Sequence, residues 1–291
     1  MLEQTKLGQG LITGENKADN KLFERYLEIL QVSSRKPSRE ALDELVATHL
    51  FRIPFENVSK IYAYKRLGRR FIPSLAEYLD GIEQDHFGGT CYTNNYYMYR
   101  LLEYLGYQVK LCGADITREG APPNGHMISM VSVDGEEVIV DVGYGAPFLR
   151  PLPRDLHGDY VITLGRDRYV LRPRNQDGRT RLELYRDGQL RHGYLAKPEA
   201  LHIDQFKEVI ERSYSDTAPF LNTILLARFW PTGMLALHNF QVVESSGSES
   251  RFRWLNNREE IVSSIHNLFG MPTDIVADVV QGLGEMKNLW S

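Results

Sequence analysis

The stretch GHMISMVSVDGEEVIVDVGYG, residues 125–145, contains two short runs rich in β-branched residues on either side of Asp134-Gly135. An Asp-Gly pair between two such runs is a strong short-range signal for a β-hairpin. Asp187-Gly188 also lies between strand-like runs. The middle third of the chain is therefore predicted to form an antiparallel β-sheet.

The first hairpin also brings a histidine and an aspartate together. With a two-residue turn, His126 and Asp141 become diagonal neighbours on one face of the sheet, about 7 to 8 Å apart between Cα atoms. A slip of one residue would place them on opposite faces. An aspartate among apolar residues is costly to bury unless it is paired. Asp141 is expected either to orient His126 or to accept backbone N–H bonds from the turn at 143–145.

A second stretch, HFGGTCYTNN at residues 86–95, places one of only two cysteines directly after a Gly-Gly turn. We expect a helix to begin at Thr90 or Cys91, so that unpaired N–H groups and the positive end of the helix dipole lie at the sulfur. Gly88-Gly89 would let the backbone approach closely. This arrangement suits a thiolate nucleophile and an oxyanion hole. The alternative is that Cys91 is a small buried hydrophobic residue.

Together these residues have the logic of a catalytic triad. Cys91 would attack, His126 would take and return the proton, and Asp141 would fix the orientation of the imidazole. His86 is a rival base, but it lies before the flexible Gly-Gly turn. Cys112 lies in a strand-like run with no base nearby in sequence, so a packing role is predicted for it.

Helical periodicity dominates the first part of the chain. Apolar residues recur at helical spacing within 22–30 and 42–50. Ser74 and Glu77 have the form of a capping box and predict a short helix that reaches about Leu79. A further helix is expected to follow the Gly-Gly turn. These patterns predict a helical bundle.

The periodicity changes to that of strands after residue 107, and helical and strand-like runs alternate after about residue 205. The serine-rich run at 245–250 is predicted to be a flexible loop. The predicted segments are a tail at 1–21, a helical bundle with the cysteine at 22–106, a β segment with the histidine and aspartate at 107–205, and an α/β segment at 206–291.

Composition limits the function classes. The chain has 291 residues, 42% of them hydrophobic, and a formal net charge of −4, so it can bury a sizeable core and has no general attraction to nucleic acid or anionic membranes. No membrane span, secretory signal or zinc motif is recognised. The sequence favours a cytoplasmic protein that acts on a small molecule, without a metal and with an unspecified oligomeric state.

Several separated motifs resemble those of arylamine N-acetyltransferases. They are RIPFENV at 52–58, GGTCYTNN at 88–95, GHMISMVSVDGEEVIVDVGYG at 125–145 and PFLNTILLARF at 219–229. The resemblance implies an α+β fold with an N-terminal helical bundle, a central antiparallel β-barrel, a C-terminal α/β lid and a cysteine-peptidase-like catalytic core.

The resemblance also implies a ping-pong reaction. Acetyl-CoA would acetylate the cysteine, and the acetyl group would pass to an arylamine, arylhydrazine or N-hydroxyarylamine. The implied site residues are the triad Cys91, His126 and Asp141; Gly125, Gly143 and Gly145 near CoA; and Phe55 and Tyr144 beside the acceptor ring. Two other functions fit the same residues, a cysteine hydrolase or amidase and a catalytically impaired binding protein.

The sequence departs from the family pattern near the cysteine. Phe87 stands where the family usually has arginine, and Thr93 stands where it often has glutamate or glutamine. The arginine commonly pairs with the glutamate of the PFEN motif, here Glu56. Glu56 is therefore expected to point to solvent, to find another cation, or to be buried alone with a raised pKa.

The segment 166–191 is rich in arginine, with eight arginines and four acidic residues. A solvated antiparallel hairpin accounts for this composition. The alternative is that some of these arginines attract the phosphates of CoA.

Overall fold

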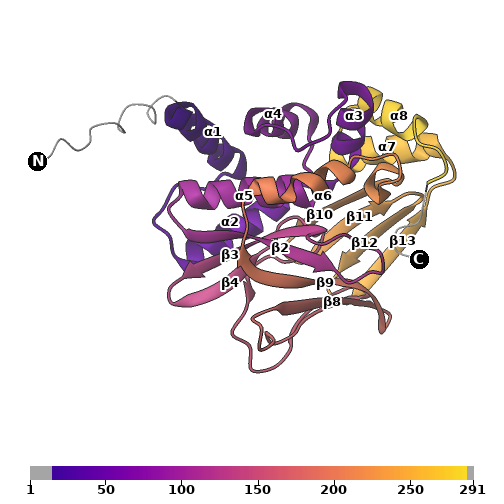
Figure 1. Cartoon of the computed structure of the whole chain (residues 1–291). Helices are drawn as coiled ribbons and strands as arrows, with labels where there is room; N and C mark the ends of the chain where they lie inside the picture. Colours follow the sequence, from indigo (N-terminus) through magenta and orange to yellow (C-terminus); the bar gives the residue numbers. More distant parts are fainter. Residues whose placement is uncertain (1–14, 287–291) are drawn as a thin grey trace, which may run out of the picture.

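The computed structural model describes residues 15–286, so residues 1–14 of the predicted tail lie outside the described part. Helices form the upper layer of the molecule in Figure 1. The first helix begins at Glu15, so residues 15–21, which we assigned to the tail, are helical. The helices are α1 (Glu15–Leu30), α2 (Arg39–Arg52), α3 (Val58–Leu67), α4 (Leu75–Asp85) and α5 (Cys91–Tyr104).

Two of these helices differ from the sequence prediction. The capping box of Ser74 and Glu77 is present, but α4 continues beyond Leu79 to Asp85 because Ile82 extends its buried face. Helix α3 was not predicted. Its buried face includes a lysine, Lys60, which interrupts the apolar periodicity on which a helix prediction depends.

An eight-stranded antiparallel sheet curls into a nearly closed barrel beneath the helices (Figure 1). Its strand order is β5-β4-β3-β2-β9-β8-β7-β6. The strands are β2 (Gln108–Ile116), β3 (His126–Val133), β4 (Glu136–Val140), β5 (Leu152–Pro153), β6 (Tyr160–Leu164), β7 (Asp167–Leu171), β8 (Thr180–Arg186) and β9 (Gln189–Ala200). Both Asp-Gly pairs form the tight turns predicted for them, with positive φ angles at all four residues.

A second sheet joins the N-terminal helical part of the chain to the part that follows the barrel. Strand β1 (Phe55–Glu56) pairs with β10 (Leu225–Trp230), so the PFEN motif lies at the edge of the sheet β1-β10-β11-β12-β13. This pairing links the segment predicted at 22–106 to the one predicted at 206–291. The division of the chain into a tail and three further segments stays a prediction. The remaining elements are η1 (Ile203–Phe206), α6 (Lys207–Arg212), η2 (Pro219–Leu221), β11 (Gly233–His238), β12 (Gln241–Ser246), β13 (Glu249–Trp254), α7 (Arg258–Phe269) and α8 (Thr273–Gln281).

The prediction of a flexible loop at 245–250 is wrong. Ser246 pairs with Glu249 and Ser245 with Ser250 in a tight hairpin, and the two serine hydroxyls Ser245 Oγ and Ser250 Oγ lie 2.8 Å apart. A serine-rich composition resembles a linker. Strand pairing uses backbone groups, however, so the pairing is not visible in the composition.

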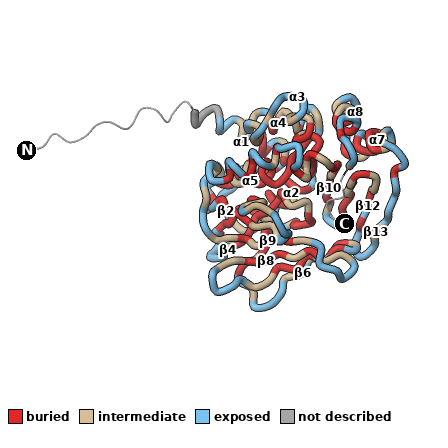
Figure 2. Tube along the Cα trace, turned by 45° about the vertical axis from the view of Figure 1, so that its right-hand side comes forward, coloured by how far each residue is buried: buried red, intermediate tan, exposed pale blue. Residues whose placement is uncertain are grey.

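Buried residues occur in the helical layer and in both sheets, as the red segments of Figure 2 show. Helix α5 lies at the centre of this arrangement, and nine of its residues, Cys91 to Asn95 with Tyr97, Met98, Leu101 and Leu102, are buried. Each fully buried apolar side chain of this size contributes about 1.5 to 3 kcal/mol. The start of α5 is therefore held rigidly against the barrel.

Candidate active site

Cys91 is the first residue of helix α5, as the sequence predicts, and Thr90 is its extended N-cap. The first intrahelical bonds run from the N–H groups of Thr93 and Asn94 to Thr90 O. The backbone N–H groups of Cys91 and Tyr92 precede Thr93, the first residue whose N–H group forms one of these intrahelical bonds. The sulfur thus lies at a helix terminus that favours negative charge.

The turn before Cys91 is built from close backbone contacts. A Cβ atom on Gly88 would lie 1.9 Å from Pro54 O, so only glycine fits this position. Glu56 N donates to Gly89 O at 3.1 Å, and Gly88 N donates to Glu56 Oε1 at 3.1 Å. The Gly-Gly turn is therefore fastened to strand β1 through the backbone and side chain of Glu56.

Glu56 is fully buried, and none of the cations in residues 15–286 forms an ion pair with it. Its carboxylate accepts hydrogen bonds from Ser59 N, Ser59 Oγ and Gly88 N. Burial raises the pKa of Glu56, and these hydrogen bonds oppose the shift only in part. Of the three outcomes expected for this residue, the structure has the buried carboxyl without a cation.

His126 opens strand β3, and its Nε2 atom lies 2.9 Å from Asp141 Oδ2. The predicted register is observed, because Ser129 pairs with Val140 and Val133 with Glu136. The side chains of His126 and Asp141 are both buried. This hydrogen bond leaves Nδ1 as the ring nitrogen available to Cys91.

Burial by itself lowers the pKa of His126, but the charge of Asp141 and the hydrogen bonds to Asp141 and Cys91 outweigh it and raise the pKa above its ordinary value. A protonated imidazole beside a cysteine favours the thiolate form of the sulfur. The raised pKa of His126 therefore favours the protonated imidazole beside Cys91.

Asp141 lies just after strand β4 and accepts three hydrogen bonds. The donors are His126 Nε2, Asn95 Nδ2 at 2.8 Å and Gly143 N at 3.1 Å. Both expected roles of Asp141 thus occur together, since it orients the imidazole and also accepts from the following turn. A Cβ atom on Gly143 would lie 2.7 Å from Cys91 Cα, so glycine is required where this turn meets Cys91.

Asn95 is a positioning residue that the sequence analysis missed. Its Nδ2 also donates to Met127 O at 2.6 Å, and its Oδ1 accepts from Val142 N at 2.8 Å. The side chain therefore ties α5 to both strands of the hairpin. Its spacing of four residues from Cys91 places it on the same helix face, which is the signal that would have found it.

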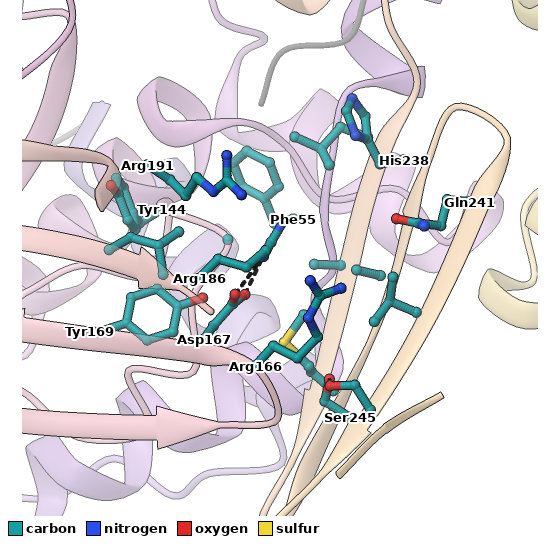
Figure 3. A pocket seen from close by; sticks show the side chains of 18 of the residues that line it. Phe55, Tyr144, Arg166, Asp167, Tyr169, Arg186, Arg191, His238, Gln241 and Ser245 are labelled. Atoms are coloured by element: carbon teal, nitrogen blue, oxygen red, sulfur yellow. Dashed lines mark hydrogen bonds and ion pairs between the residues drawn. The ribbon is translucent and has the colours of Figure 1, made fainter. Parts of the chain in front are cut away.

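An open pocket of about 1010 Å³ lies between the barrel and the second sheet (Figure 3). Phe55, Tyr144 and Gly145 line it, whereas Gly125 and Gly143 are not among its lining residues. The Tyr144 ring packs edge-on against the His126 imidazole, with 5.3 Å between ring centroids. Tyr144 thus contacts both the pocket and His126, whereas Cys91, His126 and Asp141 are not among the lining residues.

Comparison with known proteins agrees with this geometry. The profile of an N-acetyltransferase family matches residues 38–278. A segment of 128 residues is 31% identical to the arylamine N-acetyltransferase pineal gland isozyme NAT-3 of Gallus gallus, covering 43% of this chain and 42% of that protein. The chain belongs to the arylamine N-acetyltransferase family.

Two further similar proteins show how much of the chain the similarity covers. Proansamycin X synthase of Amycolatopsis mediterranei is 35% identical over 122 residues, 39% of this chain and 44% of that protein. The match thus spans less than half the length of these two relatives. The arylamine N-acetyltransferase of Mycobacterium marinum in complex with CoA has a TM-score of 0.74 at 18% identity, covering 89% of this chain and 98% of that one. Its fold is the fold of this chain.

The two departures from the pattern of arylamine N-acetyltransferases lie on either side of Cys91. Phe87 is almost fully buried in the apolar cluster that contains Val58 and Ile61. Thr93 packs against Gly89, where an added Cβ would lie 2.8 Å from Thr93 Cβ. An apolar contact and hydrogen bonds to Glu56 therefore support the turn where the family has an ion pair.

The rival residues lie elsewhere. His86 is the exposed left-handed C-cap of α4 and packs against Gly270. Cys112 is fully buried in the barrel core, and burial raises its pKa to about 12. Neither is placed to replace a member of the predicted triad.

Residues 15–286 contain no group of three or more His, Cys, Asp or Glu side chains that could hold a metal ion. No helix among these residues is both long and apolar enough to cross a membrane.

Proposed function

We propose that this chain is a cytoplasmic enzyme that transfers acetyl from acetyl-CoA to an arylamine, arylhydrazine or N-hydroxyarylamine in a ping-pong reaction. The observation that carries the proposal is the buried 2.9 Å hydrogen bond between His126 Nε2 and Asp141 Oδ2, beside a cysteine at a helix N-terminus. Family membership supports the substrate class.

In the first half-reaction the Cys91 thiolate attacks the carbonyl carbon of acetyl-CoA. The carbon–sulfur bond to CoA breaks, and the CoA sulfur takes the proton of His126, so that a Cys91 acetyl-thioester, neutral His126 and CoA remain. The backbone N–H groups of Cys91 and Tyr92 are the candidate donors to the developing oxyanion.

In the second half-reaction the amine nitrogen attacks the thioester carbon. His126 takes the proton from that nitrogen, and Cys91 leaves as a thiolate. Asp141 holds the imidazole in position throughout and stabilises its protonated form. Gly125, Gly143 and Gly145 are proposed to lie near CoA, and Phe55 and Tyr144 to enclose the acceptor ring. A flat aromatic amine needs such apolar walls.

The test is the intact mass of the protein after brief incubation with acetyl-CoA. The wild type and the control Cys112→Ser are expected to gain one acetyl group, which an arylamine then removes, whereas Cys91→Ser gains none. A wild type that gains no acetyl group would contradict the proposal. Loss of the adduct at the same rate without an amine would instead indicate a hydrolase.

A further inference from the structure

Cys91 is almost fully buried, and one connecting segment supplies part of the apolar cluster around it. The residues of η1, of α6 and of the turn that follows them in this cluster are Phe206, Val209, Ile210 and Tyr214. The Phe206 ring lies edge-on to Tyr92 of α5, with 6.4 Å between ring centroids, so this segment lies beside the start of α5 (Figure 1). We call residues 203–216, which comprise η1, α6 and the four residues after them, the strap.

The strap is attached to its surroundings through side chains. Within the part of the chain that the structure describes, no hydrogen bond between backbone groups joins it to α3, to α5 or to either sheet. Its apolar side chains belong to the cysteine cluster, whereas most of its other residues are exposed. A segment with an exposed outer face and no backbone bonds to its neighbours is of the kind that opens locally at low free energy.

Helix α3 supplies two polar contacts to the end of the strap. Lys60 and Tyr64 are four residues apart, so their side chains lie on one face of α3. Lys60 Nζ donates to Ser213 Oγ at 2.7 Å, and the Tyr64 hydroxyl donates to Asp216 Oδ1 at 2.7 Å. The centre of the Tyr214 ring lies 4.1 Å from Lys60 Nζ and 6.4 Å from the centre of the Tyr64 ring. These contacts hold the strap against α3.

An open hollow of about 900 Å³ lies beside these contacts. Lys60 and Tyr214 line it together with Thr90, the residue before the cysteine, but Cys91 is not among its lining residues. The pocket of Figure 3 does not include Cys91 either. Tyr214 belongs both to the wall of the hollow and to the cysteine cluster. Moving this ring away from α3 would therefore join the hollow to the surroundings of the sulfur.

From these contacts we propose that the strap is a gate over Cys91, that Lys60 and Tyr64 of α3 hold it closed, and that it opens to admit acetyl-CoA. The inference rests on the proposed function for the identity of the entering molecule. A closed strap would also keep water from the sulfur. Exclusion of water would protect a thioester between the two half-reactions.

The first test measures access to the sulfur with iodoacetamide, so it does not depend on acetyl transfer. Peptide mass spectrometry gives the rate of alkylation of Cys91 in the wild type, Tyr64→Phe, Ser213→Ala and the control Tyr185→Phe. The control also loses a hydroxyl that donates to a carboxylate, that of Glu183, but in β8. Loss of one hydrogen bond to the strap should raise the open fraction, and with it the plateau rate at high pH, by roughly 2- to 10-fold. The control should react like the wild type.

The pH profile and the second cysteine separate access from other effects. In Tyr64→Phe and Ser213→Ala the pH of half-maximal alkylation should stay that of the wild type. Cys112, which is fully buried in the barrel, should stay unmodified. Equal plateau rates in the variants and the wild type would overturn the inference. A shifted pH profile with an unchanged plateau, or alkylation of Cys112 together with Cys91, would also overturn it, because the first shows a change in sulfur protonation and the second a general loosening.

The second test asks whether the gate controls entry of the acetyl donor. At low concentrations of acetyl-CoA, the rate of Cys91 acetylation should rise in Tyr64→Phe by the same factor as the rate of alkylation, because binding then depends on the open fraction. Faster alkylation with unchanged acetylation would overturn the role of the strap in donor entry. Absence of acetylation in every variant contradicts the proposed function alone, because access to the sulfur is measured separately.

Discussion

Lys60 lies in the interior without a carboxylate partner among residues 15–286. Its Nζ donates to Ser213 Oγ at 2.7 Å and lies 4.1 Å from the centre of the Tyr214 ring. Burial lowers the pKa of Lys60 to about 8, and the charge of Cys91 opposes the shift. The folded-state pKa is therefore below the unfolded value of 10.5. The resulting cost to stability is fully present below about pH 8 and is relieved as the pH rises toward 10.5.

Lys60→Met should consequently raise the free energy of unfolding near neutral pH. The shift in pKa corresponds to a cost on the order of 3 kcal/mol, which is the upper limit of the gain. As the pH rises from about 8 to about 10, the wild type should gain stability relative to the variant, because Lys60 is then no longer charged in the folded state. Urea unfolding at both ends of this range measures the difference, with the half-exposed Lys110→Met as the control. A variant that is less stable than the wild type and has the same pH dependence would show that burial of the charge is not the cause.

At the scale of secondary-structure elements, the features that the sequence predicted correctly are those fixed by the residues of a short turn. The Asp134-Gly135 turn fixes the register of β3 and β4, and that register places His126 beside Asp141. The burial of Glu56 could not be predicted, because it depends on the contact of β1 with the Gly-Gly turn, far away in sequence. Helix α3 was missed because a helix that buries a lysine lacks the apolar periodicity by which helices are recognised.

The capping box of α4 supports a prediction at this scale. Glu77 N donates to Ser74 Oγ at 3.3 Å, and Ser74 N donates to Glu77 Oε2 at 2.7 Å. Ser74→Ala should lower the free energy of unfolding by about 1 kcal/mol, because it leaves an N–H group of the first turn without its acceptor. The control Ser263→Ala, at an exposed position within α7, should change it by less than about 0.5 kcal/mol. Equal effects of the two substitutions in urea unfolding would contradict a specific contribution of the cap.

At the scale of the whole molecule, one buried and two partly buried histidines set the response to acid. His49 lies in α2, His192 in β9 and His238 in β11. Burial lowers their pKa values to about 3, about 3 and about 4, and Arg186 adds to the shift of the last two. Each binds a proton more readily in the unfolded chain, so stability should fall as the pH drops below about 6.5. His126 acts in the opposite direction, because its raised pKa stabilises the fold below about 6.5 and this contribution is lost at higher pH.

His49→Gln tests this account of acid unfolding. His49 is fully buried, with Nδ1 3.0 Å from the Tyr26 hydroxyl. Loss of the hydrogen bond to Tyr26 should lower the free energy of unfolding by about 1 kcal/mol near neutral pH. On acidification, however, the stability of the variant should fall less steeply than that of the wild type, by about 1.4 kcal/mol per pH unit, because unfolding takes up one fewer proton. Urea unfolding between about pH 7 and pH 4 gives both slopes, and the exposed His202→Gln serves as the control. His49 is the one titrating group that this variant removes from the core. An unchanged dependence of stability on pH in His49→Gln would therefore mean that the acid sensitivity arises elsewhere.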